Sequence, residues 1–294
     1  MTRSRSRTAI AAAASAAIVA AGCGFGPGSS TEGEATLTVT RDYGAEPMRK
    51  ATVSDPSESE TVIRLLDREA EVETRYGGGF VQSIDGVKGA VEDGRSHDWF
   101  FYVNGVESEA GAAEVRVRAG DRIWWDHRDW TDAMRVPAVV GSWPEPFLQA
   151  SAGADRVPVR VECAGERPPC EIVLDALADE GVTASIEKFG ADGPAEALRL
   201  LAGPWDLIRE DPAAALVDEG PAVSGVFSET PDAGLIAAVR HGEDPVTWLI
   251  TGTDATAVDD AADALDTSNL ADRYAIAVSG GEVTPLPSDR GESP

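Results

Sequence analysis

The chain has 294 residues, of which 51 are Asp or Glu and 25 are Lys or Arg, so its formal net charge is -26 at pH 7. That length is typical of about two domains, and a hydrophobic content of 43% supports an ordinary buried core. So negative a surface repels nucleic acid and anionic lipid headgroups, and we expect no nucleic-acid partner. The acidic residues are scattered rather than grouped in blocks, which favours solvation of a secreted protein over an acidic binding function.

The N-terminus carries a targeting pattern. Arg3, Arg5 and Arg7 precede an Ala-rich apolar run over residues 9–21, and Gly22 and Cys23 follow it. A basic region, a short apolar region and small residues before a cleavage point are typical of a secretory signal peptide. The apolar run is shorter than the about 20 residues that a membrane span requires. A plain signal peptide and an uncleaved anchor remain the alternatives to lipid attachment.

The position of Cys23 directly after small residues indicates the type of signal peptide. Residues 16–23, AAIVAAGC, resemble a lipoprotein signal peptide. The resemblance implies removal of residues 1–22, a diacylglycerol group on the Cys23 thiol, and attachment to the extracytoplasmic face of the cell membrane. Residues 23–34 are rich in Gly, Ser and Pro, and we interpret them as a flexible tether.

Two further cysteines, Cys163 and Cys170, form an even pair in an oxidising compartment, which predicts a disulfide. In the chain-entropy model a bridge that closes so short a loop stabilises the fold by about 2.5 kcal/mol. The alternative is a metal site, but the spacing is not CxxC and the three histidines, His97, His127 and His241, lie far apart in sequence. We therefore expect no bound metal and no cofactor.

Residues 35–131 are predicted to form a small α+β domain with a β-grasp-like sheet packed on one helix. The predicted strands are Ala35–Thr40, Phe80–Ile84, Trp99–Val103, Val115–Arg118 and Arg122–Trp130, and the predicted helix is Thr61–Ala70. Asn104 and Gly105 are typical of a tight hairpin turn, because both central residues must tolerate positive φ.

The aromatic strands provide the candidate ligand-binding residues Tyr102, Asn104, Trp124 and Trp130. Period-two alternation separates Trp99, Phe101 and Val103 from Phe100, Tyr102 and Asn104. In the next strand it separates Ile123, Trp125 and His127 from Trp124, Asp126, Arg128 and Trp130. One face must cover the helix. The other either presents Trp and Tyr rings to a ligand or is covered by the connector or the second domain.

Residues 132–154 contain several Pro and Gly residues and are interpreted as a connector, residues 155–286 as an α/β domain, and residues 287–294 as a disordered tail. The strands predicted in the α/β domain are Val157–Glu162, Val182–Phe189, Trp205–Ile208, Ala222–Phe227, Val246–Thr251 and Tyr274–Val278. The predicted helices are Glu171–Glu180, which ends before Gly181, Pro194–Leu201, Pro212–Asp218, which is capped by Asp211, and Ala255–Leu265.

The stretch Thr61–Trp130 resembles the transcobalamin-like C-terminal domain family. The motifs that carry the resemblance are YGGGFVQSIDG at 76–86, WFFYVNGVES at 99–108 and GAAEVRVRAGDRIWW at 111–125. The resemblance implies a β-grasp-related fold and a role in nutrient capture. In the vitamin carriers this domain covers cobalamin together with a large helical-barrel domain, which this chain lacks. The C-terminal part, with PVTWLITGTD at 245–254, looks similar to actinobacterial lipoproteins.

No catalytic residues are predicted. The chain has no GxSxG motif, and Ser224 in AVSGV is interpreted as a core or turn hydroxyl. We therefore expect a lipid-anchored extracytoplasmic binding protein for a small molecule or nutrient, and not an enzyme. The alternative is a structural or assembly lipoprotein of the envelope that acts through protein-protein contacts.

Overall fold

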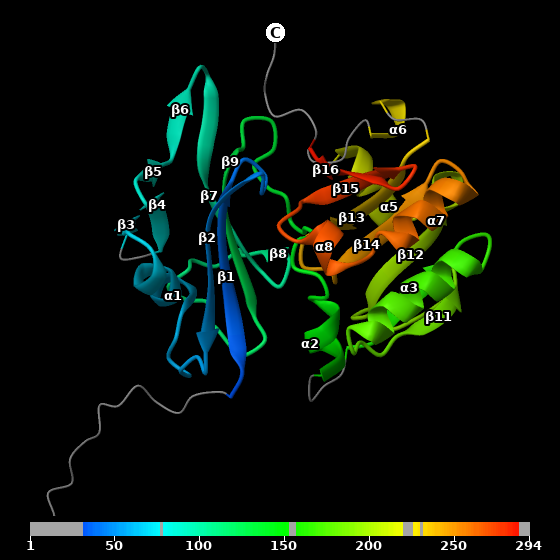
Figure 1. The fold of residues 1–294 in the computed structure, drawn as a ribbon, viewed down its shortest axis with the longest axis horizontal. Helices are drawn as coiled ribbons and strands as arrows, with labels where there is room; N and C mark the ends of the chain where they lie inside the picture. The colour runs from blue at the N-terminus through cyan, green and yellow to red at the C-terminus, as the bar shows by residue number, and fades with distance from the viewer. Residues whose placement is uncertain (1–31, 77–78, 153–156, 220–225, 230–231, 288–294) are drawn as a thin grey trace, which may run out of the picture.

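The computed structural model describes residues 32–76, 79–152, 157–219, 226–229 and 232–287. It confirms the predicted α+β fold. Figure 1 shows two parts side by side, an N-terminal domain drawn blue to green and a C-terminal domain drawn green to red. The predicted lipid site at Cys23, the connector residues 153–154 and nearly all of the predicted tail lie outside the described residues.

The N-terminal sheet has the strand order β2-β1-β9-β7-β6, with β8 paired to β7. Its central strands β1 and β9 run parallel, while β1 with β2 and β7 with β9 form antiparallel pairs. This is the predicted β-grasp-like arrangement. The strands are β1 (Glu34–Arg41), β2 (Glu46–Ser54), β6 (Ala90–Glu92), β7 (Arg95–Val103), β8 (Val106–Glu107) and β9 (Arg122–Asp129).

The helix α1 (Val62–Glu69) packs on one face of this sheet through Val62, Leu65 and Leu66, all of which are buried. A smaller sheet of β3 (Val72–Arg75), β4 (Phe80–Ile84) and β5 (Val87–Lys88) completes the domain. The turn between β7 and β8 is confirmed, since Asn104 and Gly105 have φ of 55° and 78°. The predicted strand Val115–Arg118 is wrong, because this segment forms a single bridge from Arg116 to Thr61. The strand β2 was not predicted.

The segment after β9 is packed against both domains. Val136, Val139, Val140, Trp143 and Phe147 are all buried. Trp143 contacts Trp248 at a ring-centroid distance of 5.6 Å, and the short helix α2 (Phe147–Ala152) leads to the next strand. These apolar contacts hold residues 136–147 in place.

The C-terminal sheet has the order β11-β10-β12-β14-β13-β15-β16. The strands β10, β11, β12 and β14 are parallel, and β13, β15 and β16 form antiparallel pairs. The strands are β10 (Val159–Cys163), β11 (Ser185–Lys188), β12 (Leu198–Pro204), β13 (Gly234–Val239), β14 (Thr247–Gly252), β15 (Ala275–Ser279) and β16 (Glu282–Leu286).

Helices cover both faces of this sheet (Figure 1). One face packs against α3 (Pro168–Asp179), α7 (Ala255–Asp263) and α8 (Thr267–Leu270). The other packs against α4 (Trp205–Ile208), α5 (Pro212–Glu219) and α6 (Val226–Glu229). Asp211 caps α5 as predicted, since its side chain accepts a hydrogen bond of 2.9 Å from the amide of Ala213.

Three predicted elements of the C-terminal domain are wrong. Residues 198–204 form the strand β12 where a helix over Pro194–Leu201 was expected, because a parallel strand buried on both faces shows no alternation. Trp205–Ile208 is a helical turn and not a strand. Val226 and Phe227 belong to α6 and not to a strand, while residues 222–225 with Ser224 lie outside the described residues. The strands β13 and β16 were missed.

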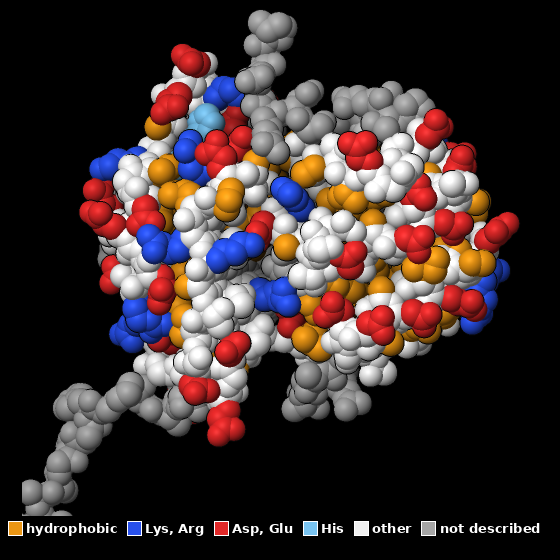
Figure 2. Space-filling model, in the orientation of Figure 1, with side chains coloured by type: hydrophobic (Ala, Val, Ile, Leu, Met, Phe, Trp, Pro, Cys, Tyr) orange, Lys and Arg blue, Asp and Glu red, His pale blue; other side chains and the backbone are white. Residues whose placement is uncertain are grey.

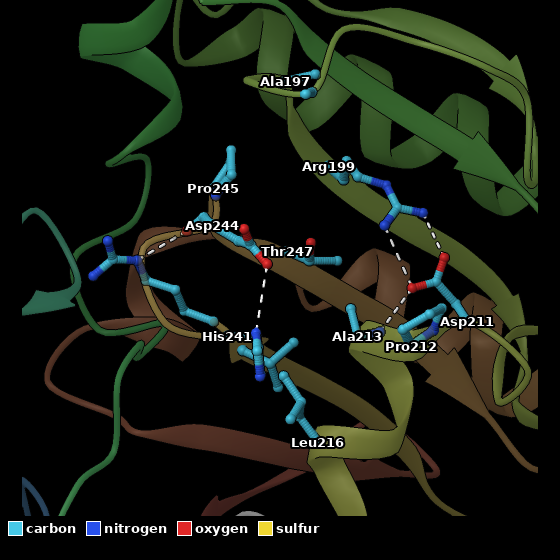
Figure 3. A pocket seen from close by; sticks show the side chains of 13 residues that line it. Ala197, Arg199, Asp211, Pro212, Ala213, Leu216, His241, Asp244, Pro245 and Thr247 are labelled. Atoms are coloured by element: carbon cyan, nitrogen blue, oxygen red, sulfur yellow. Dashed lines mark hydrogen bonds and ion pairs between the residues drawn. The ribbon is translucent and has the colours of Figure 1, made fainter.

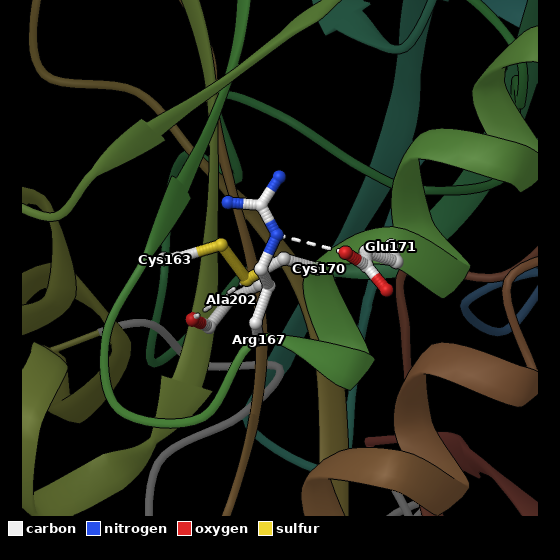
Figure 4. The surroundings of a disulfide bond; sticks show 5 residues. All are labelled: Cys163, Arg167, Cys170, Glu171 and Ala202. Atoms are coloured by element: carbon white, nitrogen blue, oxygen red, sulfur yellow. Dashed lines mark hydrogen bonds and ion pairs between the residues drawn. A yellow bond between two sulfur atoms is a disulfide. The ribbon is translucent and has the colours of Figure 1, made fainter.

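The predicted disulfide between Cys163 and Cys170 is confirmed. It joins the end of β10 to the first turn of α3, next to Ala202 of the neighbouring strand β12 (Figure 4). The loop that it closes is exposed over residues 165–168, and Arg167 donates a hydrogen bond of 2.8 Å to Glu171. The bond fixes the start of α3 against the sheet.

Acidic side chains are spread over the face of the C-terminal domain shown in Figure 2, where few Lys or Arg side chains lie. Most basic side chains on this face lie on the N-terminal domain. Within the described ranges, the model contains no helix with the length and apolar character of a membrane span.

Candidate functional site

Two of the predicted ligand-binding residues lie inside the molecule. Tyr102 is fully buried and Trp124 is 3% exposed. Both rings contact Tyr274 of the C-terminal domain, at centroid distances of 5.7 and 5.2 Å. The expectation that these rings are exposed is therefore wrong, because the C-terminal domain covers this face of the sheet. The alternation that assigned the residues to faces is correct.

A buried carboxylate supports the contact between the domains. Asp126 accepts hydrogen bonds from the Thr40 hydroxyl at 2.5 Å, the Tyr43 amide at 3.0 Å and the Tyr274 hydroxyl at 3.1 Å. Burial raises the pKa of Asp126, and these hydrogen bonds oppose that rise. Because the carboxylate is well supplied with partners from both domains, we assign it a structural role.

Arg128 lies beside this carboxylate and is also buried. Its guanidinium donates hydrogen bonds to the carbonyl groups of Ala133 and Met134 at 3.0 and 3.1 Å, and lies 3.8 Å from the centre of the Phe100 ring. These contacts tie the segment after β9 to the sheet. The aromatic face is thus a domain interface.

The other two predicted residues make local contacts. The Asn104 side chain donates to Asp121 at 2.9 Å and accepts from the Arg122 amide at 2.8 Å, which stabilises the hairpin turn. Trp130 is half-buried just after β9, where its amide donates to the Ser96 carbonyl at 2.8 Å. The four predicted residues do not line either of the two cavities described next.

The N-terminal domain contains a cavity of about 450 Å³, here called the histidine cavity. Its polar lining includes Arg41, Glu46, Lys88, Glu92, His97 and His127. The residues come from the ends of β1 and β2, the β5–β6 segment, and the neighbouring strands β7 and β9. Its volume lies in the range of about 300–1,000 Å³ typical of small-molecule sites.

Two histidines stack at the wall of this cavity. The His97 and His127 rings are 5.9 Å apart and nearly parallel, and His127 also contacts the Trp99 ring at 5.1 Å. Nε2 of His127 lies 3.1 Å from the Lys88 carbonyl oxygen. Nδ1 of His97 is buried and has no hydrogen-bond partner among the described residues. A buried nitrogen without a partner is uncommon in folded proteins and calls for an explanation.

The protonation of His127 follows from its surroundings. Burial lowers the pKa of His127, and the hydrogen bond to the Lys88 carbonyl only partly opposes this. The ring is therefore neutral at pH 7, with one nitrogen available as an acceptor. The cavity presents uncharged imidazole between charged groups of both signs.

The C-terminal domain contains a second cavity, of about 470 Å³, between α5 and the edge of the sheet at which β12 and β14 begin. We call it the α5 cavity. Figure 3 shows Arg199 with Asp211 on one side and His241 with Asp244 on the other, with Thr247 and Leu216 between them. Open α/β sheets usually bind ligands at the carboxyl ends of their parallel strands, whereas this cavity lies at the amino ends of β12 and β14.

A chain of ion pairs crosses the sheet and ends at the α5 cavity. Arg199 donates to Glu162 at 2.7 and 3.0 Å and to Asp211 at 2.6 Å. Arg160 in turn lies 3.5 Å from Glu162 and 2.5 Å from Glu187. The hydrogen bonds that Arg199 donates, first to Glu162 and then to Asp211, raise the pKa of Arg199. Since two carboxylates neutralise it, Arg199 is not available to a lone anion.

Comparisons with known proteins bear on the N-terminal domain. Residues 59–128 match the family model described as Domain of unknown function (DUF4430). This family is transcobalamin-like. The match begins before α1 and ends within β9, so it includes both cavity histidines. A search of curated proteins found no match.

Among solved structures, the chain is similar to a candidate metal-binding protein from Ruminococcus gnavus ATCC 29149. The two are 17% identical, the alignment covers 33% of this chain and 98% of the other, and the TM-score is 0.26. In the described part of the chain, no group of three or more His, Cys, Asp or Glu side chains has the arrangement of a metal site.

Sequence reasoning missed both cavities. It dismissed the histidines because they are separated by 30 positions in the chain, although alternation had placed His127 on the face of Trp125. Pairing of Trp99 with His127 brings His97 next to that ring on the same face. The pairing of the two strands was the signal that could have found the histidine pair.

Proposed function

We propose that the chain is a lipid-anchored extracytoplasmic binding protein that holds a small molecule in the histidine cavity. The observation that carries the proposal is a cavity of about 450 Å³ that is lined by the stacked rings of His97 and His127 and by charged groups of both signs. The cavity lies largely in the domain that matches a transcobalamin-like family, which supports ligand binding.

The ligand of this cavity should be polar and uncharged where it meets the histidines. Neutral imidazole favours a hydroxyl or amide group, because such a group can form a hydrogen bond with the ring and carries no charge. Charged groups of both signs, Arg41 and Lys88 with Glu46 and Glu92, surround that position. They favour a ligand whose outer part carries several hydrogen-bonding groups.

Native mass spectrometry of the protein purified from its own host tests the binding site. We expect a bound small molecule in the wild type and in Ser96→Ala, whose side chain lies on the other face of β7, and its loss in His97→Ala. Equal retention in all three proteins would contradict the histidine cavity as the site.

The anchor is a separate part of the proposal. It is supported by the basic, apolar and small-residue pattern before Cys23. Cys23→Ala should block lipid attachment and leave an unprocessed precursor. A variant that is still lipidated in the membrane fraction would show that the anchor lies elsewhere.

A structural or assembly lipoprotein of the envelope is the second candidate function. Tyr76 is 87% exposed, and Val91 and Met134 are also largely exposed. Large exposed apolar groups are typical of contact surfaces when they cluster. Copurification of an envelope protein, with the histidine cavity empty in the wild type, would favour this function over ligand capture.

A further inference from the structure

We infer that the α5 cavity is a second binding site and that it takes a small organic ammonium ion with an apolar body. The inference is independent of the proposed function, because this cavity lies wholly in the C-terminal domain. It rests on the lining of the cavity, on the charges at its two sides and on the charge of the whole chain.

The walls of the α5 cavity are mostly apolar. Ala197, Ala213, Leu216, Val239 and Pro245 contribute to them, and Ala197 and Val239 are buried. A pocket with apolar walls and a few polar groups is the usual form of a small-molecule site. The body of the ligand is therefore an alkyl or similar apolar group.

The charges on the inner side exclude a simple anion. Arg199 is held by Glu162 and Asp211, and Glu162 also lies 3.5 Å from Arg160. The Asp211 carboxylate also caps α5. An anion placed here would have to compete with Asp211 for Arg199, and the field of a chain with net charge -26 opposes it.

On the outer side of the cavity, the Asp244 carboxylate has few partners among the described residues. Asp244 lies 3.6 Å from Nδ1 of His241, an ion pair only when His241 is protonated, and both side chains are more than 70% exposed. Arg240, the nearby cation, donates its Nε hydrogen to the backbone carbonyl of Asp244 and not to its carboxylate. Asp244 and Thr247 both line the cavity, and Figure 3 shows the two side chains between Arg199 and His241.

These two groups match the donors of an ammonium ion. An ammonium group donates up to three hydrogen bonds and accepts none, and the Asp244 carboxylate and the Thr247 hydroxyl both accept. The apolar body would then lie against Leu216 and Val239. A carboxylate ligand could accept a hydrogen bond from the Thr247 hydroxyl, but the Asp244 carboxylate would repel it.

Ligand-observed NMR with isopentylamine, and with isopentanoate as its anionic counterpart, tests the inference on the full chain. We expect the amine to bind and the acid not to bind. Asp244→Asn should weaken amine binding about tenfold, as loss of a hydrogen bond to a charged group does. Glu243→Gln is the matched control, because it removes the same charge from the same loop without lining the cavity, and it should bind as the wild type does.

Thr247→Val provides a second variant, since it retains the β-branched shape in the strand. We expect it to weaken amine binding severalfold while circular dichroism shows an unchanged fold. Equal weakening in Asp244→Asn and Glu243→Gln would show a diffuse field effect and overturn the inference. Binding of isopentanoate as tight as that of the amine, or no binding of the amine, would also overturn it.

Discussion

The hydroxyl groups of Tyr102 and Tyr274 form a buried hydrogen bond of 3.2 Å that joins β7 of the N-terminal domain to the residue before β15. The Tyr274 hydroxyl also donates to Asp126. Burial raises the pKa of both tyrosines, so neither titrates in the neutral range. The two domains therefore meet through a neutral, hydrogen-bonded aromatic cluster.

Truncation of this cluster should be costly. We expect Tyr102→Ala and Trp124→Ala each to lower the free energy of unfolding by about 3–5 kcal/mol, as large-to-small core substitutions do. Trp130→Ala should cost clearly less, because Trp130 is only half-buried. Chemical denaturation of the three variants checks this order. Losses at Tyr102 and Trp124 no larger than that at Trp130 would contradict the buried interface.

Glu145 predicts a pH dependence of stability. Burial raises its pKa from 4.5 to about 7, and the hydrogen bond from the Gln149 amide opposes this only in part. Between these two pKa values the folded state binds more protons than the unfolded state, so stability falls as pH rises through this window. The loss amounts to about 3 kcal/mol.

Glu145→Gln should remove that loss, because the amide stays neutral and still accepts from Gln149. We expect the variant to equal the wild type near pH 4.5 and to exceed it in stability at pH 8. Urea denaturation at both pH values measures the difference. If the free energies of unfolding of the variant and the wild type differed by the same amount at both pH values, the titration of Glu145 would not be the cause.

The ion-pair chain of the C-terminal sheet predicts strong coupling. Arg199→Met leaves Glu162, a buried carboxylate, with the Gly190 amide at 3.3 Å and Arg160 at 3.5 Å as its partners. We expect a loss of about 3–5 kcal/mol, as for a broken buried ion pair. Combination with Glu162→Gln should restore part of this stability. Additive effects in a double-mutant cycle would contradict a direct interaction.

Loss of the disulfide should destabilise the start of α3. In the chain-entropy model, replacement of both Cys163 and Cys170 by Ala lowers the free energy of unfolding by about 2.5 kcal/mol. Mass mapping without reductant should find the two residues linked in the wild type. Two free thiols in protein exported to an oxidising compartment would contradict the bond there.

The N-terminal fold was more predictable from sequence than the C-terminal fold. Alternation in β7 and β9 correctly separated the Trp99 face from the Tyr102 face, because each strand has one face toward α1 and another toward the second domain. In contrast, β12 is apolar on both faces and was mistaken in part for a helix. Short buried segments carry no periodic signal that separates strands from helices.

The cavities were not predictable to the same degree. The histidine cavity combines residues from β1, the β5–β6 segment and β9, which become neighbours only through long-range strand pairing. The predicted ligand-binding role of Tyr102 was wrong for a related reason. Tyr274, which packs against its ring, is 172 positions away in the chain. One sequence does not specify which domain surface covers an aromatic face.

The parallel pairing of β1 with β9 also has a mechanical consequence. β1 is hydrogen-bonded on both sides, to β2 and to β9, from its first residues onward. A force applied along the strand axis at the start of β1 would load these two ladders in shear, so that many hydrogen bonds resist together and none is peeled off alone. The domain is thus suited to stay folded when tension is applied through the segment that precedes Glu34.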